Sequence, residues 1–341
     1  MKEELNNNPK VTKIYMDTEF TGLQMPTSLI SIGLISECGK TFYAEFTDYN
    51  KEQVTPWIQE NVIDKLIYKE RFNETSMICY PSKNQIECFG LKWMISCWLE
   101  QYLNQFEQVE IYSDCLSYDW VLFNDIFGDA FSIPENVYYI PFDICTTFKE
   151  KGIDPDISRE LYAKYVGEYQ KHNALFDAKI IKACHERLMQ HDYYQELIYR
   201  AKELVNFHFR FKFDKGGAPY TEHLFEVADN FDPIIYPEEH ILAILHDLVE
   251  DIKKFRTNPK VLKDIFGEVI YNGLIAITKK QGEDYYTYLD RVKHNDLALP
   301  VKKKDIEHNM KIDRIKNPIP KDFARIEKYA KALEYLNTYG I

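Results

Sequence analysis

The stretch Lys13-Ile-Tyr-Met-Asp17-Thr-Glu19 decides the fold of the first half of this chain. A short apolar run, typical of a buried strand, ends in two acids that are two positions apart. Side chains i and i+2 of a strand point to one face of the sheet, so both carboxylates would share one site. Like charges this close repel unless a cation holds them, and oxygen-rich sites of this kind bind Mg²⁺ or Mn²⁺. Two acids exposed on the surface would produce the same sequence pattern, so a metal site needs support from elsewhere in the chain.

Strand and helix patterns alternate after this stretch. Two apolar runs, 28–36 and 41–46, flank a Cys-Gly step that is typical of a hairpin turn. Three strands followed by alternating helices and strands predict an α/β layer with a mixed sheet. The further expected elements are the helices 91–106, 116–127 and 174–189 and the strands 109–112 and 137–140.

The strand patterns stop near residue 190. A change from α/β to all-α patterning marks a domain boundary. We expect an α/β domain over 1–192 and an all-α domain over 198–341. The helices expected in the second domain are 240–252, 264–278 and 322–336.

Composition limits the class of protein. The chain has 341 residues, 45% of them apolar, which suits one or two globular domains. Its apolar runs are too short to cross a bilayer, and its N-terminus lacks the apolar core of a signal peptide. The seven cysteines have neither zinc-clamp spacing nor the pattern of a disulfide framework. We therefore expect a cytoplasmic protein that does not bind membranes.

The charge is uneven along the chain. Residues 1–190 carry 18 basic and 29 acidic side chains, whereas 191–341 carry 24 and 25. The first half therefore lacks the basic stripe of a tight duplex binder. If it acts on nucleic acid, bound metal ions must supply much of the positive charge, which favours a processing enzyme that holds a strand end.

Two later motifs add ligands to the first pair of acids. The segment Asp114-Cys-Leu-Ser-Tyr-Asp119 follows a predicted strand and opens a helix. The segment His172-Asn-Ala-Leu-Phe-Asp177 precedes and enters another helix. Imidazole titrates close to neutral pH, so the histidine can act as a base.

In this order, the three motifs resemble those of DEDDh-type 3′→5′ exonucleases, which have an RNase H-like fold. The sequence Asp17-Thr-Glu-Phe-Thr-Gly22 is similar to that of the RNase AS-like branch, which consists of small exoribonucleases common in bacteria and phages. The resemblance covers about residues 11–190.

The resemblance implies a role for each residue. His172 would accept the proton of the attacking water. Asp114 is an alternative ligand to Asp119, although it matches a variable polar position of the family. Phe20 and Leu23 would stack on the terminal base, or would be plain core residues. Two Mg²⁺ or Mn²⁺ ions would be held by Asp17, Glu19, Asp119 and Asp177.

A second group of ionisable residues lies in the all-α half. The helix predicted over 240–252 carries His246, Asp247, Glu250 and Asp251 in an otherwise apolar sequence. Residues i and i+4 share a helix face, so these groups would form two pairs. Burying them unpaired is costly, and a metal ion removes that cost.

Three segments together resemble the HD superfamily of metal phosphohydrolases: Gly217-Ala-Pro-Tyr-Thr-Glu-His223, Leu245-His-Asp-Leu-Val-Glu-Asp251 and Lys303-Lys-Asp305. Over about 198–336 the sequence is most like the hydrolase domain of RelA/SpoT-type proteins and small alarmone hydrolases. The resemblance implies one Mn²⁺ or other divalent ion. Its ligands would be His223, His246, Asp247 and Asp305. Glu250 and Asp251 would orient or deprotonate the water, while Tyr220 and Asn309 would contact the substrate.

Two departures concern the substrate. Ile306 stands where the family usually has Arg, and the basic segment before the Gly-Ala-Pro-Tyr run is reduced to Arg210 and Lys212. These positions would contact guanine or phosphate, which weighs against guanosine tetraphosphate as the substrate. The lysines at 302–304 are expected on a solvated helix face, with contact to substrate phosphates as the alternative. His308 is expected to be a structural or surface residue.

The sequence therefore predicts a bifunctional hydrolase. The first domain would be an exonuclease on the 3′ ends of single-stranded RNA, and the second would hydrolyse a phosphorylated nucleotide such as guanosine tetraphosphate. The alternative is an exonuclease on DNA 3′ ends whose HD half senses a nucleotide without hydrolysing it. The sequence also leaves a homodimer open.

Overall fold

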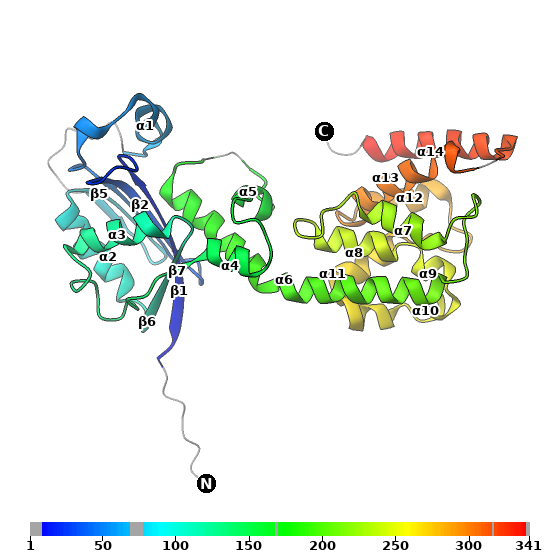
Figure 1. Ribbon diagram of the computed structural model, residues 1–341, viewed down its shortest axis with the longest axis horizontal. Helices are drawn as coiled ribbons and strands as arrows, with labels where there is room; N and C mark the ends of the chain where they lie inside the picture. Colours follow the sequence, from blue (N-terminus) through cyan, green and yellow to red (C-terminus); the bar gives the residue numbers. More distant parts are fainter. Residues whose placement is uncertain (1–8, 69–77, 168–169, 316, 339–341) are drawn as a thin grey trace, which may run out of the picture. The chain divides into compact units, whose positions relative to one another are not determined.

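A computed structural model describes residues 9–68, 78–167, 170–315 and 317–338 of the chain. The chain divides into two compact units, Met1–Met189 and Gln190–Ile341. The first unit contains all seven strands, and the second is helical (Figure 1). The predicted order, an α/β region with a mixed sheet followed by an all-α region, is confirmed.

The sheet of the first unit is mixed, with strand order β4-β5-β3-β2-β1-β6-β7. Its strands are β1 (Val11–Phe20), β2 (Leu29–Ser36), β3 (Thr41–Phe46), β4 (Ile78–Pro81), β5 (Gln85–Gly90), β6 (Gln108–Ser113) and β7 (Phe142–Asp143). β1 pairs antiparallel with β2 and parallel with β6, which places it inside the sheet. The predicted hairpin joins β2 to β3, and Gly39 in its turn has a φ of 88°, a conformation that favours glycine.

Helices cover both faces of this sheet. They are α1 (Pro56–Asn61), α2 (Lys92–Leu103), α3 (Leu116–Phe127), α4 (Ile144–Glu150), α5 (Arg159–Tyr162) and α6 (Ala174–Phe209), with 3-10 turns η1 (Lys51–Gln53) and η2 (Ile63–Lys65). Ile14 and Met16 of β1 pack in one cluster with α2 and α3. Tyr15 lies on the other face, where its hydroxyl is 3.0 Å from Nδ1 of His185 in α6. The alternation of β1 therefore puts the two acids of its DxE pair on the face that α6 covers.

The strand predicted over 137–140 is wrong. Val137 forms only an isolated bridge with Val109, and the chain pairs with β6 again at the two residues of β7. Pro141 lies between these contacts and has no N–H to donate, so a continuous ladder cannot form there.

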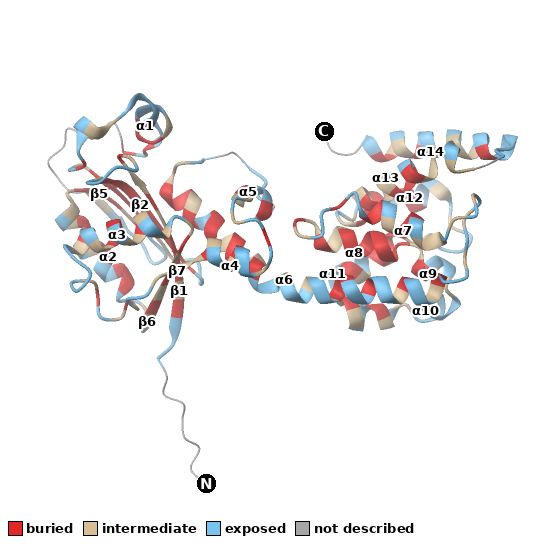
Figure 2. Ribbon diagram, in the orientation of Figure 1, coloured by how far each residue is buried: buried red, intermediate tan, exposed pale blue. Residues whose placement is uncertain are grey.

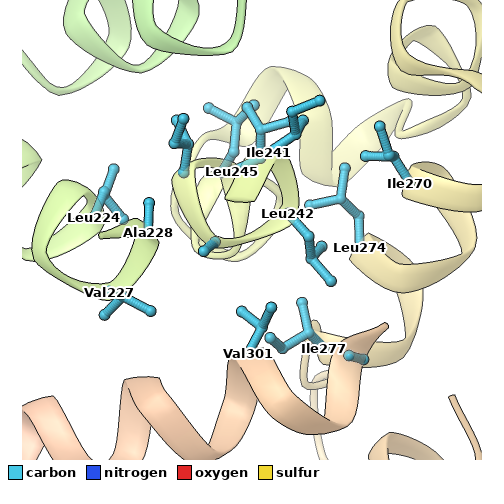
Figure 3. Packing of buried hydrophobic residues seen from close by; sticks show 14 of the residues in the cluster. Leu224, Val227, Ala228, Ile241, Leu242, Leu245, Ile270, Leu274, Ile277 and Val301 are labelled. Carbon is cyan, nitrogen blue, oxygen red and sulfur yellow. The ribbon is translucent and has the colours of Figure 1, made fainter. Parts of the chain in front are cut away.

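The second unit is a group of helices around one apolar core. Its elements are the later part of α6, α7 (Tyr220–Ala228), α8 (Pro237–Leu245), α9 (Leu248–Asp251), α10 (Lys253–Thr257), α11 (Lys260–Ile277), α12 (Tyr285–Lys293), α13 (Ala298–Asn309), η4 (Ile312–Arg314) and α14 (Pro320–Asn337). α8 is almost wholly buried (Figure 2). Side chains of α7, α11 and α13 pack around it, among them Leu224, Leu274 and Val301 (Figure 3). None of the helices in the described part of the chain is long and apolar enough to span a bilayer.

Two predicted helices are interrupted. The helix expected over 240–252 ends at Leu245 and resumes at Leu248, so the His246-Asp247 step lies between α8 and α9. Both residues keep helical backbone angles, and the N–H of Asp251 still donates to the carbonyl of Asp247 at 2.9 Å, so Asp251 lies one helical turn after Asp247 as expected. α11 is broken at Gly267, whose φ of 80° only glycine adopts readily.

Candidate active sites in the two units

In the first unit, a glycine lets α6 approach the acids of β1. Gly33 of β2 is the register partner of Asp17 in β1. A Cβ on Gly33 would lie 2.3 Å from backbone atoms of Ala174 and Leu175, at the start of α6. Glycine therefore permits a close packing that no other residue allows, and this packing places the start of α6 beside the DxE pair.

The segment before α6 supplies His172 and Asp177. His172 has a φ of 66°, and its N–H donates to Oδ2 of Asp177 at 2.9 Å. Positive φ is uncommon for a residue with a side chain, and the site holds it in place. Nδ1 of His172 lies 3.7 Å from Oε1 of Glu19, and its ring meets the indole of Trp57 at 5.1 Å between centroids. Carboxylate oxygens of Asp17, Glu19 and Asp177 all lie within 4.8 Å of one another.

Asp119 lies in the first turn of α3 and is fully buried. Its Oδ1 accepts a hydrogen bond from Thr18 at 2.5 Å, and its Oδ2 accepts one from the hydroxyl of Ser113. Oxygens of Asp17, Asp114 and Asp119 form a second group within 4.8 Å. The structure thus brings the five residues of the predicted exonuclease site together, with Asp17 common to both groups.

Asp114 is the competitor of Asp119 for a metal ion. Oδ2 of Asp114 accepts a hydrogen bond from Nε of Arg159 at 3.1 Å, which offsets its charge. Asp119 is held by neutral hydroxyls, which leave its full negative charge for a cation. However, Asp114 lines the cleft, whereas Asp119 is fully buried and is not among its lining residues. The charge balance favours Asp119 as a ligand and Asp114 as the anchor of Arg159.

The acids open into a cleft of 770 Å³. Burial raises the pKa of Asp119 to about 7, and burial with the charge of Glu19 raises that of Asp177 to about 7. Burial and the neighbouring Asp119 hold the pKa of Asp17 well above its usual range. Oδ2 of Asp17 is buried without a hydrogen-bond partner. An orphaned carboxylate oxygen among other acids is unfavourable, and a divalent cation would correct this, so these residues fit such an ion.

Aromatic and basic side chains line the same cleft. Phe20 stacks on Tyr118 with centroids 5.1 Å apart, and Leu23 is 70% exposed, so Leu23 is not a core residue. Three lining residues were missed by sequence reasoning: Trp57, Arg159 and Lys171. All three lie outside the motifs. The one sequence signal is that Trp57 is an isolated tryptophan in a polar segment.

In the second unit, the four predicted metal ligands meet. Nε2 of His223 and Nε2 of His246 are 3.3 Å apart. Oδ2 of Asp247 lies 3.7 Å and 3.3 Å from these two nitrogens. Oδ1 of Asp305 lies 3.4 Å and 3.5 Å from them. Ligand atoms about 2.1 Å from a shared tetrahedral centre lie roughly 3.4 Å apart, which the distances to the two histidine nitrogens match. The atoms that all lie within 4.8 Å of one another are those of His223, His246 and Asp247, and Asp305 meets the two histidines at the edge of this group.

Outer hydrogen bonds orient three of these ligands. Nδ1 of His246 lies 2.7 Å from the carbonyl of Ala243, which leaves Nε2 for the cluster. The hydroxyl of Tyr220 donates to Oδ2 of Asp247 at 2.5 Å. Tyr220 therefore holds a ligand as well as lining the adjacent pocket.

Asp305 receives two hydrogen bonds, one of them unexpected. Nδ2 of Asn309 donates to its Oδ1 at 2.6 Å, and Nζ of Lys302 donates to its Oδ2 at 2.7 Å. The solvated face predicted for Lys302 is wrong, because its side chain is only 17% exposed and neutralises Asp305. His308 is not a surface residue either, since it is buried behind His223.

Glu250 and Asp251 lie outside the ligand cluster. Both are exposed, and Asp251 forms an ion pair with Lys212. Nζ of Lys212 lies 3.4 Å from the centre of the Tyr220 ring. These two acids lie on α9, about one helical turn after His246 and Asp247, since the N–H of Asp251 donates to the carbonyl of Asp247 at 2.9 Å.

The cluster of the second unit balances its own charge. Burial alone would lower the pKa of His246, but the charge of Asp247 and a hydrogen bond with Asp305 raise it to about 9. Burial alone would raise the pKa of Asp247, but the charge of His246 holds it below the usual range. Without a metal ion, protons on imidazole compensate the carboxylates.

A small basic pocket adjoins His223. Its volume is 230 Å³, and it is also lined by Asn309 and Phe213. Its cationic lining residues are Lys215, Lys311, Arg314 and Arg325. Each cation has an acidic partner: Lys215 and Arg325 pair with Asp322, Arg314 with Asp214 and Lys311 with Glu226. Four cations against three acids leave a small excess of positive charge, which favours an anionic ligand.

Comparisons with known proteins add two observations. Two relatives, the 3′-5′ exoribonucleases of two strains of Mycobacterium tuberculosis, are each 23% identical to this chain over 171 residues. The alignment covers 49% of this chain and 87% of each relative. No family model matches the chain.

A solved structure of a metazoan ortholog of SpoT, described as hydrolysing ppGpp, also matches. The match has a TM-score of 0.35 and 16% identity, and it covers 41% of this chain and 84% of that one. A similarity of this size does not establish a shared fold, so the case for the second unit rests on its own residues.

Proposed function

We propose that the first unit is a metal-dependent 3′→5′ exoribonuclease of the DEDDh type, with an RNase H-like fold over residues 1–192. The observation that carries this proposal is the grouping of Asp17, Glu19, His172 and Asp177 at one cleft, with Asp119 buried next to Asp17. The exoribonuclease relatives support it, because an alignment of 171 residues is longer than the whole of Gln190–Ile341 and must include part of the first unit.

In this site, each residue has a distinct task. The four carboxylates would hold two Mg²⁺ or Mn²⁺ ions, which supply a nucleophilic water and stabilise the leaving oxygen. The imidazole of His172, held by its backbone turn and by Glu19, accepts the proton of that water. Phe20 and Leu23 contact the terminal base, and Arg159 and Lys171 meet the backbone phosphates of the strand.

We further propose that residues 198–341 form an HD-type phosphohydrolase. His223, His246, Asp247 and Asp305 would hold one Mn²⁺ or other divalent ion, which polarises a phosphoryl oxygen and lowers the pKa of a bound water. The basic pocket beside His223 favours a phosphorylated nucleotide, with guanosine tetraphosphate the first candidate. Glu250 and Asp251, on the exposed side of the cluster, orient the water, and Asn309 links the ligand Asp305 to the pocket.

One assay separates the possibilities. The full-length chain is incubated with Mn²⁺ and 3′-labelled RNA, 3′-labelled single-stranded DNA, or a panel of nucleotides that includes guanosine tetraphosphate. We expect labelled mononucleotide from RNA and phosphate or pyrophosphate from one nucleotide. Release from DNA but not from RNA would identify a DNA exonuclease. Tight nucleotide binding without turnover would identify the second unit as a sensor.

A further inference from the structure

A chain of hydrogen bonds starts at the nitrogen of His223 that does not face the ligand cluster. His308 of α13 is 3% exposed, and its Nδ1 lies 2.7 Å from Nδ1 of His223. Nη1 of Arg314 lies 2.8 Å from the same Nδ1 of His308. The other nitrogen of His308, Nε2, lies 2.7 Å from Oε2 of Glu226.

Arg314 sets the direction of every bond in this chain. A guanidinium has only donors, so Nδ1 of His308 must be an acceptor. The proton of His308 is then on Nε2, where it is donated to Glu226. Because Nδ1 of His308 accepts, Nδ1 of His223 must be the donor. In the neutral ring that a metal ion binds, Nε2 of His223 is then the bare nitrogen, and it is this atom that faces His246, Asp247 and Asp305.

We propose that Arg314 and His308 are positioning residues that hold His223 in the tautomer a metal ion requires. The proposal rests on the metal site proposed for the second unit. Arg314 is itself fixed, because its Nη2 donates to Oδ2 of Asp214 at 2.8 Å. Asp214 also accepts the N–H of Ala218 at 2.9 Å, in the loop that leads into α7 and His223.

Arg314 and Glu226 both favour the arrangement in which the proton of His308 is on Nε2, and without Arg314 only the bond to Glu226 does so. His308 can then carry its proton on Nδ1 and donate to His223, which moves the proton of His223 to Nε2 and blocks the ligand atom. Loss of an outer hydrogen bond of this kind typically lowers metal affinity by 10–100-fold. We expect Arg314→Met to lower metal affinity by about tenfold, near the lower end of this range, since one of the two arrangements still binds the metal.

The first test uses the unmodified protein. In the full-length chain loaded with Zn²⁺ and labelled with ¹⁵N-histidine, long-range ¹H–¹⁵N spectra report which ring nitrogen of each histidine is protonated. We expect Nε2 of His308 to carry the proton and Nδ1 to be bare. A proton on Nδ1 of His308 would overturn the proposal without any substitution.

The second test measures Co²⁺ affinity from the visible absorption of the metal bound by histidine. The signal that Asp247→Ala removes is assigned to this site. Arg314→Met is compared with Lys311→Met, which also removes a cation close to Glu226, since Nζ of Lys311 lies 3.5 Å from its Oε2. We expect Arg314→Met to bind about tenfold more weakly and Arg314→Lys, which keeps a donor, to recover most of the loss.

The outcomes distinguish an error in the proposed metal site from an error in the proposed positioning role. If Asp247→Ala binds Co²⁺ like the wild type, the metal site itself is wrong. If Asp247→Ala loses the signal but Arg314→Met and Lys311→Met bind equally well, only the positioning role is wrong. Failure of Arg314→Lys to improve on Arg314→Met would likewise contradict a role that depends on donating a hydrogen bond.

Discussion

The two ligand clusters of this chain balance charge in opposite ways. In the sheet unit, carboxylates gather in two groups that share Asp17, one with Glu19 and Asp177 and one with Asp114 and Asp119, and Nδ1 of His172 lies 3.7 Å from Glu19. In the helical unit, two carboxylates meet two imidazoles, and Lys302 neutralises the outer oxygen of Asp305.

This difference appears in the acidity of the groups. The pKa values of Asp119 and Asp177 are raised to about 7, chiefly by burial. Burial alone would also raise the pKa of Asp305, but Lys302 and the two histidines hold it well below its usual range. The sheet site is therefore short of positive charge and needs hard cations such as Mg²⁺ or Mn²⁺, whereas the helical site replaces its ion with protons when it is empty and suits a borderline ion.

The largest effect should come from removing a charge that the sheet site depends on. Asp17→Asn should slow RNA hydrolysis by about 10⁴-fold, the several kcal/mol that coordinated metal ions supply. Asp119→Asn should have a comparable effect in the same assay. If Asp114→Asn were inactive and Asp119→Asn active, the assignment of ligands would be reversed.

The next effect concerns the base of the sheet site. His172→Ala should lower the rate of RNA hydrolysis by about 10²–10⁴-fold, because proton transfer from the attacking water is lost. Binding of RNA, measured by fluorescence anisotropy in Ca²⁺, should change little. A His172→Ala protein that no longer binds RNA would assign His172 to the substrate contact instead.

The corresponding change in the helical site should be smaller. Glu250→Gln should slow nucleotide hydrolysis by about 10²-fold while Mn²⁺ affinity stays near that of the wild type, as expected of a group that activates water without binding the metal. Glu268→Gln, which changes another exposed acid of the same unit, is the matched control. Loss of Mn²⁺ in Glu250→Gln would show that Glu250 is a ligand.

The smallest expected effect is a difference between the two sites in how metal affinity depends on pH. A metal ion must displace the proton of a ligand whose pKa lies above the working pH, so its apparent affinity falls about tenfold per proton for each unit below that pKa. With pKa values of about 7 for Asp119 and Asp177, competition from their protons at the sheet site should end near pH 7, and only Asp17, whose pKa is held well above its usual range, adds to the pH dependence beyond that. With a pKa of about 9 for His246, affinity at the helical site should keep rising up to about pH 9. Titrations of Asp17→Asn and Asp247→Ala at pH 6 to 9 measure each site alone, and identical pH profiles would contradict the comparison.

Sequence patterns predicted the ligands better than their surroundings. The order of the elements, the hairpin at Gly39 and the acids of β1 follow from local patterns of period and turn chemistry. The short interruption of the helix at His246 and Asp247 could not be predicted, because both residues keep helical backbone angles and the helix resumes at Leu248. Lys302 and Asp305 are three positions apart, a spacing that places them side by side on a helix, but the burial of this pair depends on packing that the sequence does not show.

The central claim is that the chain contains two independent hydrolytic sites, and a crossed assay tests it most directly. The wild type, Asp17→Asn and Asp247→Ala are each given Mn²⁺ with 3′-labelled RNA and, separately, with guanosine tetraphosphate. We predict that Asp17→Asn loses release of labelled mononucleotide but still hydrolyses the nucleotide, and that Asp247→Ala shows the reverse, with RNA hydrolysis within about twofold of the wild type, because the two sites share no ligand. Loss of both activities in either variant would contradict two independent sites.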